Sequence, residues 1–310
     1  MAMKRRKHKA KKKHWIIVAI VVLIVVAIVA TSGVGKKLRA SHAKILFVGD
    51  IMFDRTIRTI AEKKGYDYMF SCVSGYFKDF DAVIGNLEGP ITKNTSLSQG
   101  TKPGQANNTT FTFSPEVARA LSRAGISAVS LGNNHIWDFG RVGSLSTRAA
   151  LAEKKIVSFG APDGALFATT TVGSARVALV SFNQFLGGSD PEKTVQAIWQ
   201  AKRDSDFVVV FAHWGDEYVP TTEYQKSLAH RFIDAGADLV VGAHPHVVQE
   251  SEIYQGKSIY YSLGNFIFDQ YWQPEVRTGL GIEVRLKDGI SEIHEVHFDI
   301  RKDGTTCLAE

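Results

Sequence analysis

Polar residues that could bind a metal ion follow five apolar segments of this chain, each at the point where the segment ends. The apolar segments are 44–49, 81–85, 126–131, 207–212 and 238–242. The polar residues after them are, in order, Asp50; Asn86 and Glu88; Asn133, Asn134 and His135; His213; and His244 and His246. Each segment is typical of a buried strand, and ligand sites of open α/β sheets lie at the carboxyl ends of strands. Carboxylate, amide and imidazole groups without a thiolate predict a site for Mn, Zn or Fe.

Two stretches carry the clearest signals. Residues 130–140 place two asparagines, His135 and Asp138 directly after one predicted strand. In His244-Pro245-His246 the proline cannot extend a central strand, so both imidazoles can project from one irregular turn. Either stretch alone would also fit a polar turn or a hydrogen-bonded buried histidine. Five strand ends of the same kind favour a functional site, because buried polar groups without partners are costly.

The positive charge of the chain is concentrated at its start. The 310 residues are enough for one large α/β domain or two small ones. Eight of the 37 Lys and Arg residues lie within residues 1–13, and the remainder has 29 basic against 31 acidic residues. A nearly neutral remainder gives no support for a nucleic-acid partner.

An apolar run follows the basic residues. Residues 15–30 contain no charged or strongly polar side chain, and with 31–34 they reach the roughly 20 residues that span a bilayer. A cleaved signal peptide is the competing interpretation, but the run is long for one and Ile28 makes cleavage after Ala30 unfavourable. We expect an uncleaved anchor at 15–34, a cytoplasmic tail at 1–14, and the chain from about residue 36 outside the cell membrane.

Strands and helices alternate in the first half of the chain, whereas the second half includes hairpins. We expect helices at 56–64, from 115, at 141–154, 195–203 and 223–235, and antiparallel pairs at 165–172 with 175–182 and at 280–287 with 290–300. This pattern predicts an α/β fold in which two mixed sheets pack face to face between helices, a four-layer α/β/β/α sandwich. The domain is expected at 44–301, after a linker at 35–43 and before a C-terminal tail at 302–310.

Two features stay open at this level. Residues 91–112 are rich in Asn, Thr, Ser, Gly and Gln without periodicity, and fit either a flexible loop beside the site or a plain surface insertion. Cys72 and Cys307 could form a disulfide in an exported domain, but two free thiols are equally compatible with the sequence.

The motifs at the strand ends resemble those of a known family. They are Gly49-Asp50, Gly85-Asn86-Leu87-Glu88, Gly132-Asn133-Asn134-His135, Ala212-His213-Trp214-Gly215 and Gly242-Ala243-His244-Pro245-His246. In this order they resemble the bacterial poly-γ-glutamate capsule synthesis family (CapA/PgsA type), a branch of the calcineurin-like metallophosphoesterases. Met52, Arg55 and residues 261–266 fit the capsule branch specifically. Members of this family are commonly membrane-anchored with the domain outside the cell, in agreement with the predicted topology.

The resemblance implies roles for eight residues. The metal ligands of a two-metal centre would be Asp50, Glu88, Asn134, His213, His244 and His246. His135 resembles the imidazole that protonates the leaving group, and Arg55 would hold an anionic oxygen of phosphate or carboxylate. This chain differs from the wider superfamily at two strand ends, where Met52 stands for a histidine and Asn86 for an aspartate. One or two divalent ions (Mn, Zn or Fe) are therefore expected, with Asp54 as a candidate replacement ligand and Asn133 as the alternative to Asn134.

The expected function is that of a membrane-anchored extracellular protein of capsule or poly-γ-glutamate biosynthesis, with a metal-dependent hydrolase site of the metallophosphoesterase type. Two alternatives remain: a surface phosphoesterase unrelated to poly-γ-glutamate, and a non-catalytic assembly subunit of a polymer synthase or export complex. The expected partners are the membrane, synthase or export subunits, and an anionic polymer or phosphoester substrate. A polymer would need a local basic patch, for which Arg55, Arg141 and Arg148 are candidates.

Overall fold

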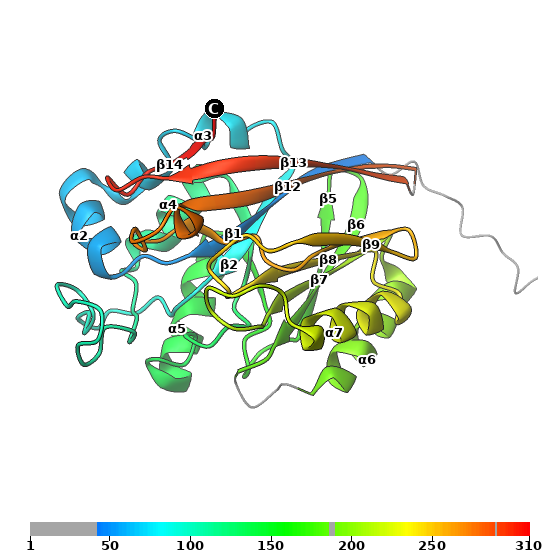
Figure 1. Cartoon of the computed structure of the whole chain (residues 1–310), viewed down its shortest axis with the longest axis horizontal. Coiled ribbons are helices and arrows are strands. Elements are labelled where there is room, and N and C mark those ends of the chain that lie inside the picture. Colours follow the sequence, from blue (N-terminus) through cyan, green and yellow to red (C-terminus); the bar gives the residue numbers. More distant parts are fainter. Residues whose placement is uncertain (1–41, 186–189, 289) are drawn as a thin grey trace, which may run out of the picture. The chain divides into compact units, whose positions relative to one another are not determined.

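The computed structural model describes residues 42–185, 190–288 and 290–310. The predicted tail at 1–14, the predicted anchor at 15–34 and the linker up to residue 41 lie outside the described residues. Within the described ranges, no helix is both long and apolar enough to cross a membrane. These ranges form two β-sheets with helices packed against them (Figure 1).

The first sheet has eight strands and carries three of the predicted ligand-bearing strand ends. Strands β1 (His42–Ile51), β2 (Ala82–Leu87), β3 (Ile126–Ser130) and β4 (Val157–Phe159) run parallel to one another. Beyond β1 lie the antiparallel strands β12 (Thr278–Lys287), β13 (Ile290–Ile300) and β14 (Thr306–Leu308), and the short β11 (Asn265–Ile267) pairs with the end of β1. The parallel order brings the ends of β1, β2 and β3 to one edge of the sheet.

The second sheet has six strands and carries the remaining two ligand-bearing ends. Strands β5 (Phe167–Val172) and β6 (Ala175–Asn183) form the predicted antiparallel pair. Strands β7 (Phe207–His213), β8 (Leu239–Ala243) and β10 (Lys257–Tyr260) continue in parallel, and β9 (Ser251–Tyr254) is antiparallel at the edge. Strands β7 and β8 are buried along their whole length, as expected for parallel strands covered on both faces.

Apolar side chains of the two sheets pack against each other, and helices cover the outer faces. The inner core joins residues such as Phe47 of β1 and Phe211 of β7. Helices α2 (Arg55–Lys64), α3 (Ser74–Phe77), α4 (Glu116–Ala124) and α5 (Gly140–Glu153), with the short 3₁₀ helix η1 (Tyr66–Phe70), pack on the first sheet. Helices α6 (Pro191–Asp204) and α7 (Glu223–Asp234) pack on the second, and the 3₁₀ helix η2 (Glu275–Arg277) precedes β12. The predicted layers of two mixed sheets between helices are thus observed.

The C-terminal segment is part of the folded domain, so the predicted tail at 302–310 is wrong. Strand β14 pairs with β13, and its Cys307 forms a disulfide with Cys72, which lies between η1 and α3. The bond joins residues 235 positions apart in the sequence. A strand of three residues has too few positions for an alternating pattern, and for that reason the sequence did not reveal it.

Residues 91–113 form a loop whose ends are held together beside α2. The hydroxyl oxygens of Thr92 and Thr112 lie 2.6 Å apart. Asp54, the N-cap of α2, accepts hydrogen bonds from the backbone N–H of Thr112 and the hydroxyl of Ser96. The flexibility of this loop stays a prediction, whereas its last residues reach the site described next.

Candidate metal centre

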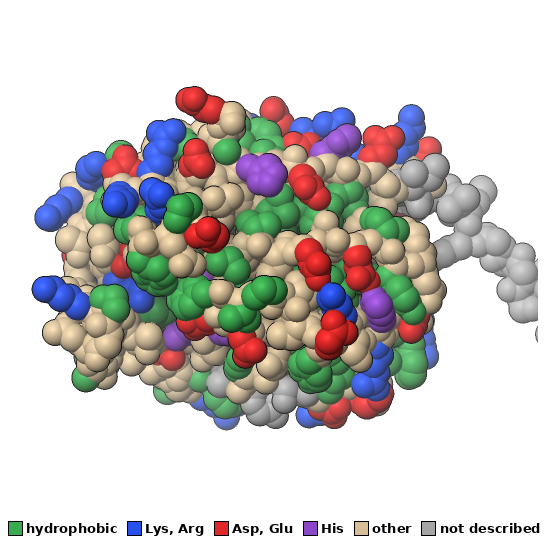
Figure 2. Space-filling model, viewed as in Figure 1, with side chains coloured by type: hydrophobic (Ala, Val, Ile, Leu, Met, Phe, Trp, Pro, Cys, Tyr) green, Lys and Arg blue, Asp and Glu red, His purple; other side chains and the backbone are tan. Residues whose placement is uncertain are grey.

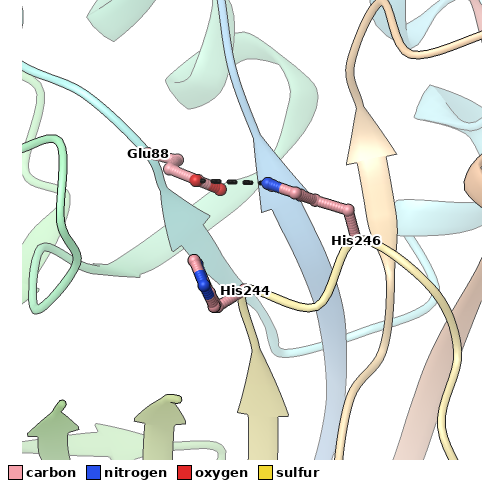
Figure 3. Close-up of side chains that lie close together, drawn as sticks. All are labelled: Glu88, His244 and His246. Carbon is pink, nitrogen blue, oxygen red and sulfur yellow. Dashed lines mark ion pairs between the residues drawn. The ribbon is translucent and has the colours of Figure 1, made fainter. Parts of the chain in front are cut away.

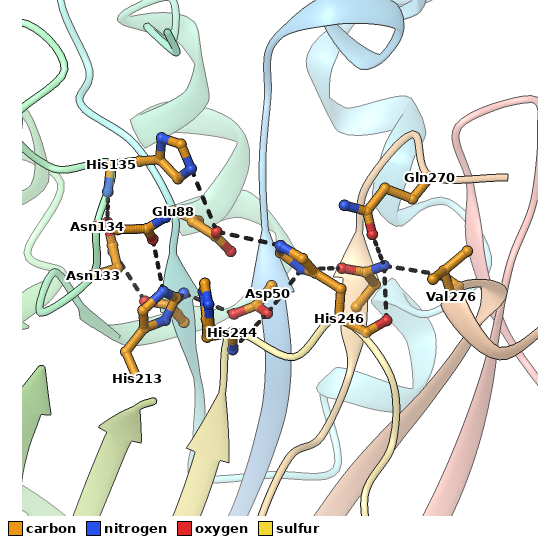
Figure 4. A network of polar contacts seen from close by, with 12 residues as sticks. Asp50, Glu88, Asn133, Asn134, His135, His213, His244, His246, Gln270 and Val276 are labelled. Carbon is orange, nitrogen blue, oxygen red and sulfur yellow. Dashed lines mark hydrogen bonds and ion pairs between the residues drawn. The ribbon is translucent and has the colours of Figure 1, made fainter. Parts of the chain in front are cut away.

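The strand ends of the two sheets meet at one place, where polar residues form a connected network (Figure 4). The first sheet supplies Asp50 at the end of β1 and Asn86 at the end of β2. The second supplies His213 at the end of β7 and His244 directly after β8. The backbone N–H of His244 donates to Asp50 Oδ2 over 3.1 Å, and Asn86 Nδ2 lies 3.3 Å from His213 Nδ1. These two hydrogen bonds tie the edges of the sheets together.

Asp50 is a fully buried carboxylate whose oxygens are both hydrogen-bonded. Asn86 Nδ2 donates to Oδ1 over 2.7 Å, and the backbone N–H of His244 donates to Oδ2. Nδ1 of His246 lies 3.3 Å from the same Oδ2. Because several donors surround it, this buried carboxylate is stabilised by the scaffold itself. Asp50 therefore organises the network in addition to being a candidate ligand.

Glu88 is also fully buried, but neither of its oxygens has a hydrogen-bond partner among the described residues. Its Oε1 lies 3.7 Å from Nε2 of His246 and 4.0 Å from Nε2 of His135; Figure 3 shows the first of these contacts. Burial, followed by the negative charges of Asp50 and Glu217, raises the pKa of Glu88 well above its usual range. A buried carboxylate without partners is expected where a cation supplies the missing charge.

His244 and His246 lie on one turn after β8, and both have left-handed backbone conformations. Their φ angles are 97° and 57°, a conformation that costs energy for residues other than glycine and that clusters at functional sites. The turn allows both rings to face the network, as the sequence predicted. In Figure 3 the two side chains approach Glu88 from the same loop.

The ring nitrogens of the two histidines differ in their partners. Nδ1 of His246 lies 3.0 Å from Asn265 Oδ1, and the amide nitrogen of Asn265 is turned away, donating to carbonyl oxygens. The proton of His246 is therefore on Nδ1, and the lone pair of Nε2 faces Glu88. Nδ1 of His244 is buried without a partner among the described residues, and burial, followed by the neighbouring His246, lowers the pKa of His244 to about 3. His244 is neutral at physiological pH, as a metal ligand must be.

Asn133 and Asn134 are adjacent in the chain, but their side chains have different hydrogen-bond partners. Asn133 donates to Asn86 Oδ1 and to a backbone carbonyl, and its own Oδ1 accepts the N–H of His135. Asn134 instead directs its Oδ1 at Nε2 of His213, 2.8 Å away. Burial, followed by the other site histidines, lowers the pKa of His213 well below its usual range. Because the scaffold already uses Asn133, the geometry favours Asn134 as the ligand candidate.

His135 lies at the rim of the network with a fixed orientation. Its Nδ1 is 2.9 Å from Oδ2 of Asp138, and its ring lies against Phe111 with ring centres 4.3 Å apart. Asp138 also accepts the backbone N–H of Phe111, so one carboxylate joins the loop 91–113 to the turn after β3. The carboxylate favours a proton on Nδ1, and Nε2 is left on the side of Glu88.

Arg55 lies near the network but is already paired. Its guanidinium is 2.5 Å from Asp269 Oδ1 and lies between the rings of Phe111 and Phe268, at 5.1 and 5.4 Å from their centres. Its Nε is buried without a partner among the described residues. Its positive charge lowers the pKa of Glu88, although less than the other contributions raise it. Arg55 therefore keeps N–H donors that its pair with Asp269 does not use.

The other two arginines of the predicted basic patch are engaged elsewhere. Arg141 and Arg148 both pair with Asp163, at 3.7 and 3.1 Å. They hold the loop after β4 against α5. Arg55, Arg141 and Arg148 thus do not form one free patch.

The geometry fits a cation best at Glu88, His244 and His246, three residues that we call the cation site. One ligand atom from each lies within 4.8 Å of the others, and all three side chains are buried. The unpaired oxygens of Glu88 and the unpaired Nδ1 of His244 are the polar atoms that a cation would satisfy. Carboxylate and imidazole donors suit Zn, Mn or Fe. The other three predicted ligands lie in the same network, where they are hydrogen-bonded to each other or to the scaffold.

Asp54 does not take the place of the missing ligand on β1. Its carboxylate caps α2 and holds the loop 91–113. Met52, the position at which the resemblance implies a histidine in the wider phosphoesterase pattern, is fully buried in the outer core, and its sulfur accepts the N–H of Asp54. Both side chains serve the scaffold.

Three residues that hold the site received no role from the sequence. Asn265 orients His246, Asp138 orients His135, and Asp269 pairs with Arg55. The first two belong to motifs that were recognised, at 261–266 and 130–140, but nothing local shows which ring each one contacts. Asp269 lies 214 positions from Arg55 and had no sequence signal.

Comparison with known proteins identifies the family. Residues 44–270 match the family described as bacterial capsule synthesis protein PGA_cap. The chain belongs to this family, and the predicted recognition is confirmed.

Two relatives from Bacillus are named as capsule proteins. The PGA biosynthesis protein CapA of Bacillus subtilis (strain 168) is 33% identical over 276 residues, which cover 83% of this chain and 71% of the relative. The capsule biosynthesis protein CapA of Bacillus anthracis is 34% identical over 285 residues, covering 84% and 64%. The chain thus spans about two thirds of the length of these relatives.

Among solved structures, a hypothetical protein from Thermus thermophilus is similar in fold. It is 19% identical, with a TM-score of 0.56, and the match covers 83% of this chain and 99% of that one. The sulfate thiohydrolase SoxB of the same organism is 12% identical with a TM-score of 0.47, over 82% of this chain and 56% of SoxB. Identities of this size concern the fold alone.

Proposed function

We propose that this chain is a membrane-anchored, extracellular protein of capsule or poly-γ-glutamate biosynthesis that carries a metal-dependent hydrolase site of the metallophosphoesterase type. The family and the names of its Bacillus relatives support the role in capsule production. The observation that carries the hydrolase proposal is the buried, unpaired carboxylate of Glu88 beside His246 and His135.

The residues around the cation site have separate tasks in this proposal. A divalent ion there would supply Lewis acidity and lower the pKa of a water. His135 would give a proton from Nε2 to the leaving oxygen. Asp138, at Nδ1, keeps the ring of His135 in place and stabilises its positive charge. Arg55 would bind an anionic oxygen of the substrate through guanidinium N–H groups that Asp269 does not occupy.

The hydrogen bonds within the network indicate how many metal ions the site can bind. A second ion would need Asn134 and His213, whose side chains hydrogen-bond to each other over 2.8 Å. Binding there would have to replace this hydrogen bond, whereas the cation site offers unpaired atoms. One ion at the cation site is therefore the first expectation, and a second ion is expected to bind more weakly.

The extracellular location is supported by the disulfide and by the predicted anchor at 15–34. Disulfides persist in oxidising compartments and are rare in the cytosol, and Cys72 is bonded to Cys307. In this arrangement the domain faces the polymer as it leaves the membrane. Synthase or export subunits and an anionic polymer or phosphoester are the proposed partners.

A non-catalytic assembly subunit is the second candidate. The observation that favours it is Met52, which is buried in the outer core and leaves one ligand fewer at the end of β1. The oriented pair of His135 and Asp138 argues for catalysis, because a structural metal needs no such pair. A surface phosphoesterase unrelated to poly-γ-glutamate shares all the features of the site and differs only in its substrate.

The test is hydrolysis by the full-length protein loaded with Mn or Zn. The probes are bis(p-nitrophenyl) phosphate and γ-glutamyl p-nitroanilide. His135→Ala is expected to lower the turnover about 100-fold while the bound metal stays unchanged. His297→Ala, an exposed histidine of β13, is the matched control and is expected to keep full turnover.

The outcomes separate the candidates. Turnover of the phosphodiester that depends on His135 supports a phosphoesterase, and loss of capsule in cells carrying His135→Ala links it to polymer production. A metal-loaded wild-type protein without turnover, together with a normal capsule in the His135→Ala strain, would leave the assembly subunit as the function.

A further inference from the structure

A cleft of about 370 Å³ lies beside the turn that carries the two histidines of the cation site. Val247 and Val248, which line it, directly follow His246 in the chain. The cleft is lined by Tyr218, Val219, Pro220, Thr221, Val247, Val248, Gln249, Glu250, Gln273 and Glu275. None of the site residues described above needs this space.

Tyr218 forms a fixed wall between the cleft and the cation site. Its ring centre is 6.0 Å from that of His246, and its backbone N–H donates to the carbonyl of Pro245 over 2.9 Å. Its hydroxyl accepts from Gln270, whose side-chain oxygen accepts from Asn265, the residue that orients His246. This hydrogen-bond chain links Tyr218, a lining residue of the cleft, to the residue that orients His246.

An exposed aromatic residue, Trp272, packs against Tyr218. The ring of Trp272 meets the ring of Tyr218 edge to face, with centres 5.5 Å apart. Trp272 is 55% exposed and Tyr218 is 37% exposed. Tyr218 lines the cleft, and Trp272 directly precedes Gln273, another lining residue. Exposed aromatic groups gathered beside a cleft tend to mark binding sites.

The polar groups of the cleft are hydrogen-bond acceptors and amides rather than cations. Its lining includes no Lys or Arg. Glu250 is paired with Lys226 at 3.1 Å. The side chains of Gln273 and Glu275 have no partner among the described residues. Figure 2 shows several acidic side chains over β9 and α7, and a group of basic ones over α2. This distribution of charge disfavours a polyanion such as poly-γ-glutamate at the cleft relative to the side of α2.

We propose that this cleft is a binding subsite for an uncharged sugar ring of a glycan. The exposed ring of Trp272 offers one flat apolar face for the C–H face of a pyranose, and the ring of Tyr218 stands nearly perpendicular to it. Carboxylate and amide oxygens of Glu275 and Gln273 accept hydrogen bonds from its hydroxyls, and the amide nitrogen of Gln273 donates to ring or acetyl oxygens. A carboxylated peptide polymer finds none of these advantages and meets like charge.

Because the cleft lies beside the cation site, a sugar bound there would be part of the substrate. Binding to the cleft needs no hydrolysis, but its role as part of the substrate rests on the proposed function. A sugar seated against Tyr218 would lie beside the ring that contacts His246, and a group attached to the sugar would extend past Tyr218 toward the cation site. The substrate class is then a glycan that carries a phosphoester, with the sugar in the cleft and the anionic oxygen toward Arg55.

The test is a titration of the full-length protein with the trisaccharide of N-acetylglucosamine and with maltotriose, measured by calorimetry. The detergent must lack a sugar headgroup, because a glycoside would compete for the cleft. Trp272→Ala is expected to weaken binding about tenfold. Trp199→Ala is the matched control, because Trp199 lies on α6 and is also 55% exposed. Gln273→Ala supplies a second variant, expected to weaken binding about threefold.

Several outcomes would overturn the proposal. Absence of saturable binding of both trisaccharides by the wild type is one. Equal weakening by Trp272→Ala and Trp199→Ala is another, since it would show only non-specific contact with tryptophan. Poly-γ-glutamate binding that depends on Trp272 would assign the cleft to the peptide polymer. Metal content is measured in parallel, and an unchanged value in Trp272→Ala separates failure of this subsite from failure of the metal centre.

Discussion

The ends of β1 and β2 lie side by side in one sheet. The two buried carboxylates found there differ in their hydrogen bonding. At the end of β1, Asp50 is surrounded by hydrogen-bond donors from Asn86 and from the turn after β8. Just beyond β2, Glu88 has no hydrogen-bond partner among the described residues, although it is equally buried. The scaffold thus stabilises the negative charge of Asp50 by hydrogen bonds. The negative charge of Glu88 would be stabilised only by a bound cation.

Asp50 and Glu88 therefore have different roles, the first in folding and the second in binding a cation. Asp50 joins the two sheets, so its charge contributes to the stability of the fold. Glu88 costs stability while it is unpaired, because burial without donors disfavours its ionised form. A polar group that destabilises the fold is expected where a ligand later stabilises it. The following three predictions test this contrast, and the largest effect comes first.

Asp50→Asn should destabilise the protein strongly, even without metal. The new amide would present a donor to groups that are themselves donors, including the backbone N–H of His244. Breaking a buried charge network of this kind costs about 3 kcal/mol, measured as the free energy of unfolding in urea. A stability equal to that of the wild type would show that Asp50 does not join the sheets.

Asn265→Ala should weaken metal binding about tenfold to 100-fold. Nδ1 of His246 loses its acceptor, so the ring is no longer held with Nε2 toward Glu88. The dissociation constant for Mn or Zn is measured by competition with a coloured chelator, on protein whose circular dichroism matches the wild type. An unchanged dissociation constant in a folded variant would show that Asn265 does not support metal binding.

Glu88→Gln should stabilise the metal-free protein at neutral pH, by about 1 kcal/mol, while it weakens metal binding. Because the pKa of Glu88 is raised in the folded state, the wild type loses stability as pH rises from its ordinary pKa through the raised value. The variant has no such loss. The stability difference should therefore grow with increasing pH and vanish below the ordinary pKa of a glutamate.

The measurement is urea unfolding of both proteins, stripped of metal, across this pH range. Saturating metal should reverse the order of stability, because the ion binds the wild type more tightly. A variant that is less stable than the metal-free wild type at neutral pH would mean that Glu88 has a partner in solution.

The sequence predicted the two sheets and the meeting of their polar strand ends well, because both depend on local patterns. Apolar runs such as 207–212 and 238–242 correspond to β7 and β8, and the polar residues after them meet as expected. The parallel order of the strands is sufficient to bring these ends together. Strand β14 was missed because its three residues are recognisable only through their pairing with β13.

The partners within the site could not be predicted, because they depend on contacts between distant segments. Nothing near Arg55 indicates that Asp269 occupies its guanidinium. The difference between Asn133 and Asn134 is likewise invisible in the sequence, since it depends on which side chain faces His213 on the other sheet. The contrast between Asp50 and Glu88 depends on hydrogen bonds from other strands and turns, which no local pattern of the sequence indicates.

The most direct test of the central claim is the metal content of the full-length protein, measured by elemental analysis after exposure to Mn and Zn. The double variant His244→Ala/His246→Ala removes two of the three residues of the cation site. The control His294→Ala/His297→Ala removes two exposed histidines of β13. We predict at least one equivalent of metal in the wild type and in the control, and its loss in the site variant. A folded wild type without bound metal, or a site variant that retains it, would contradict the account.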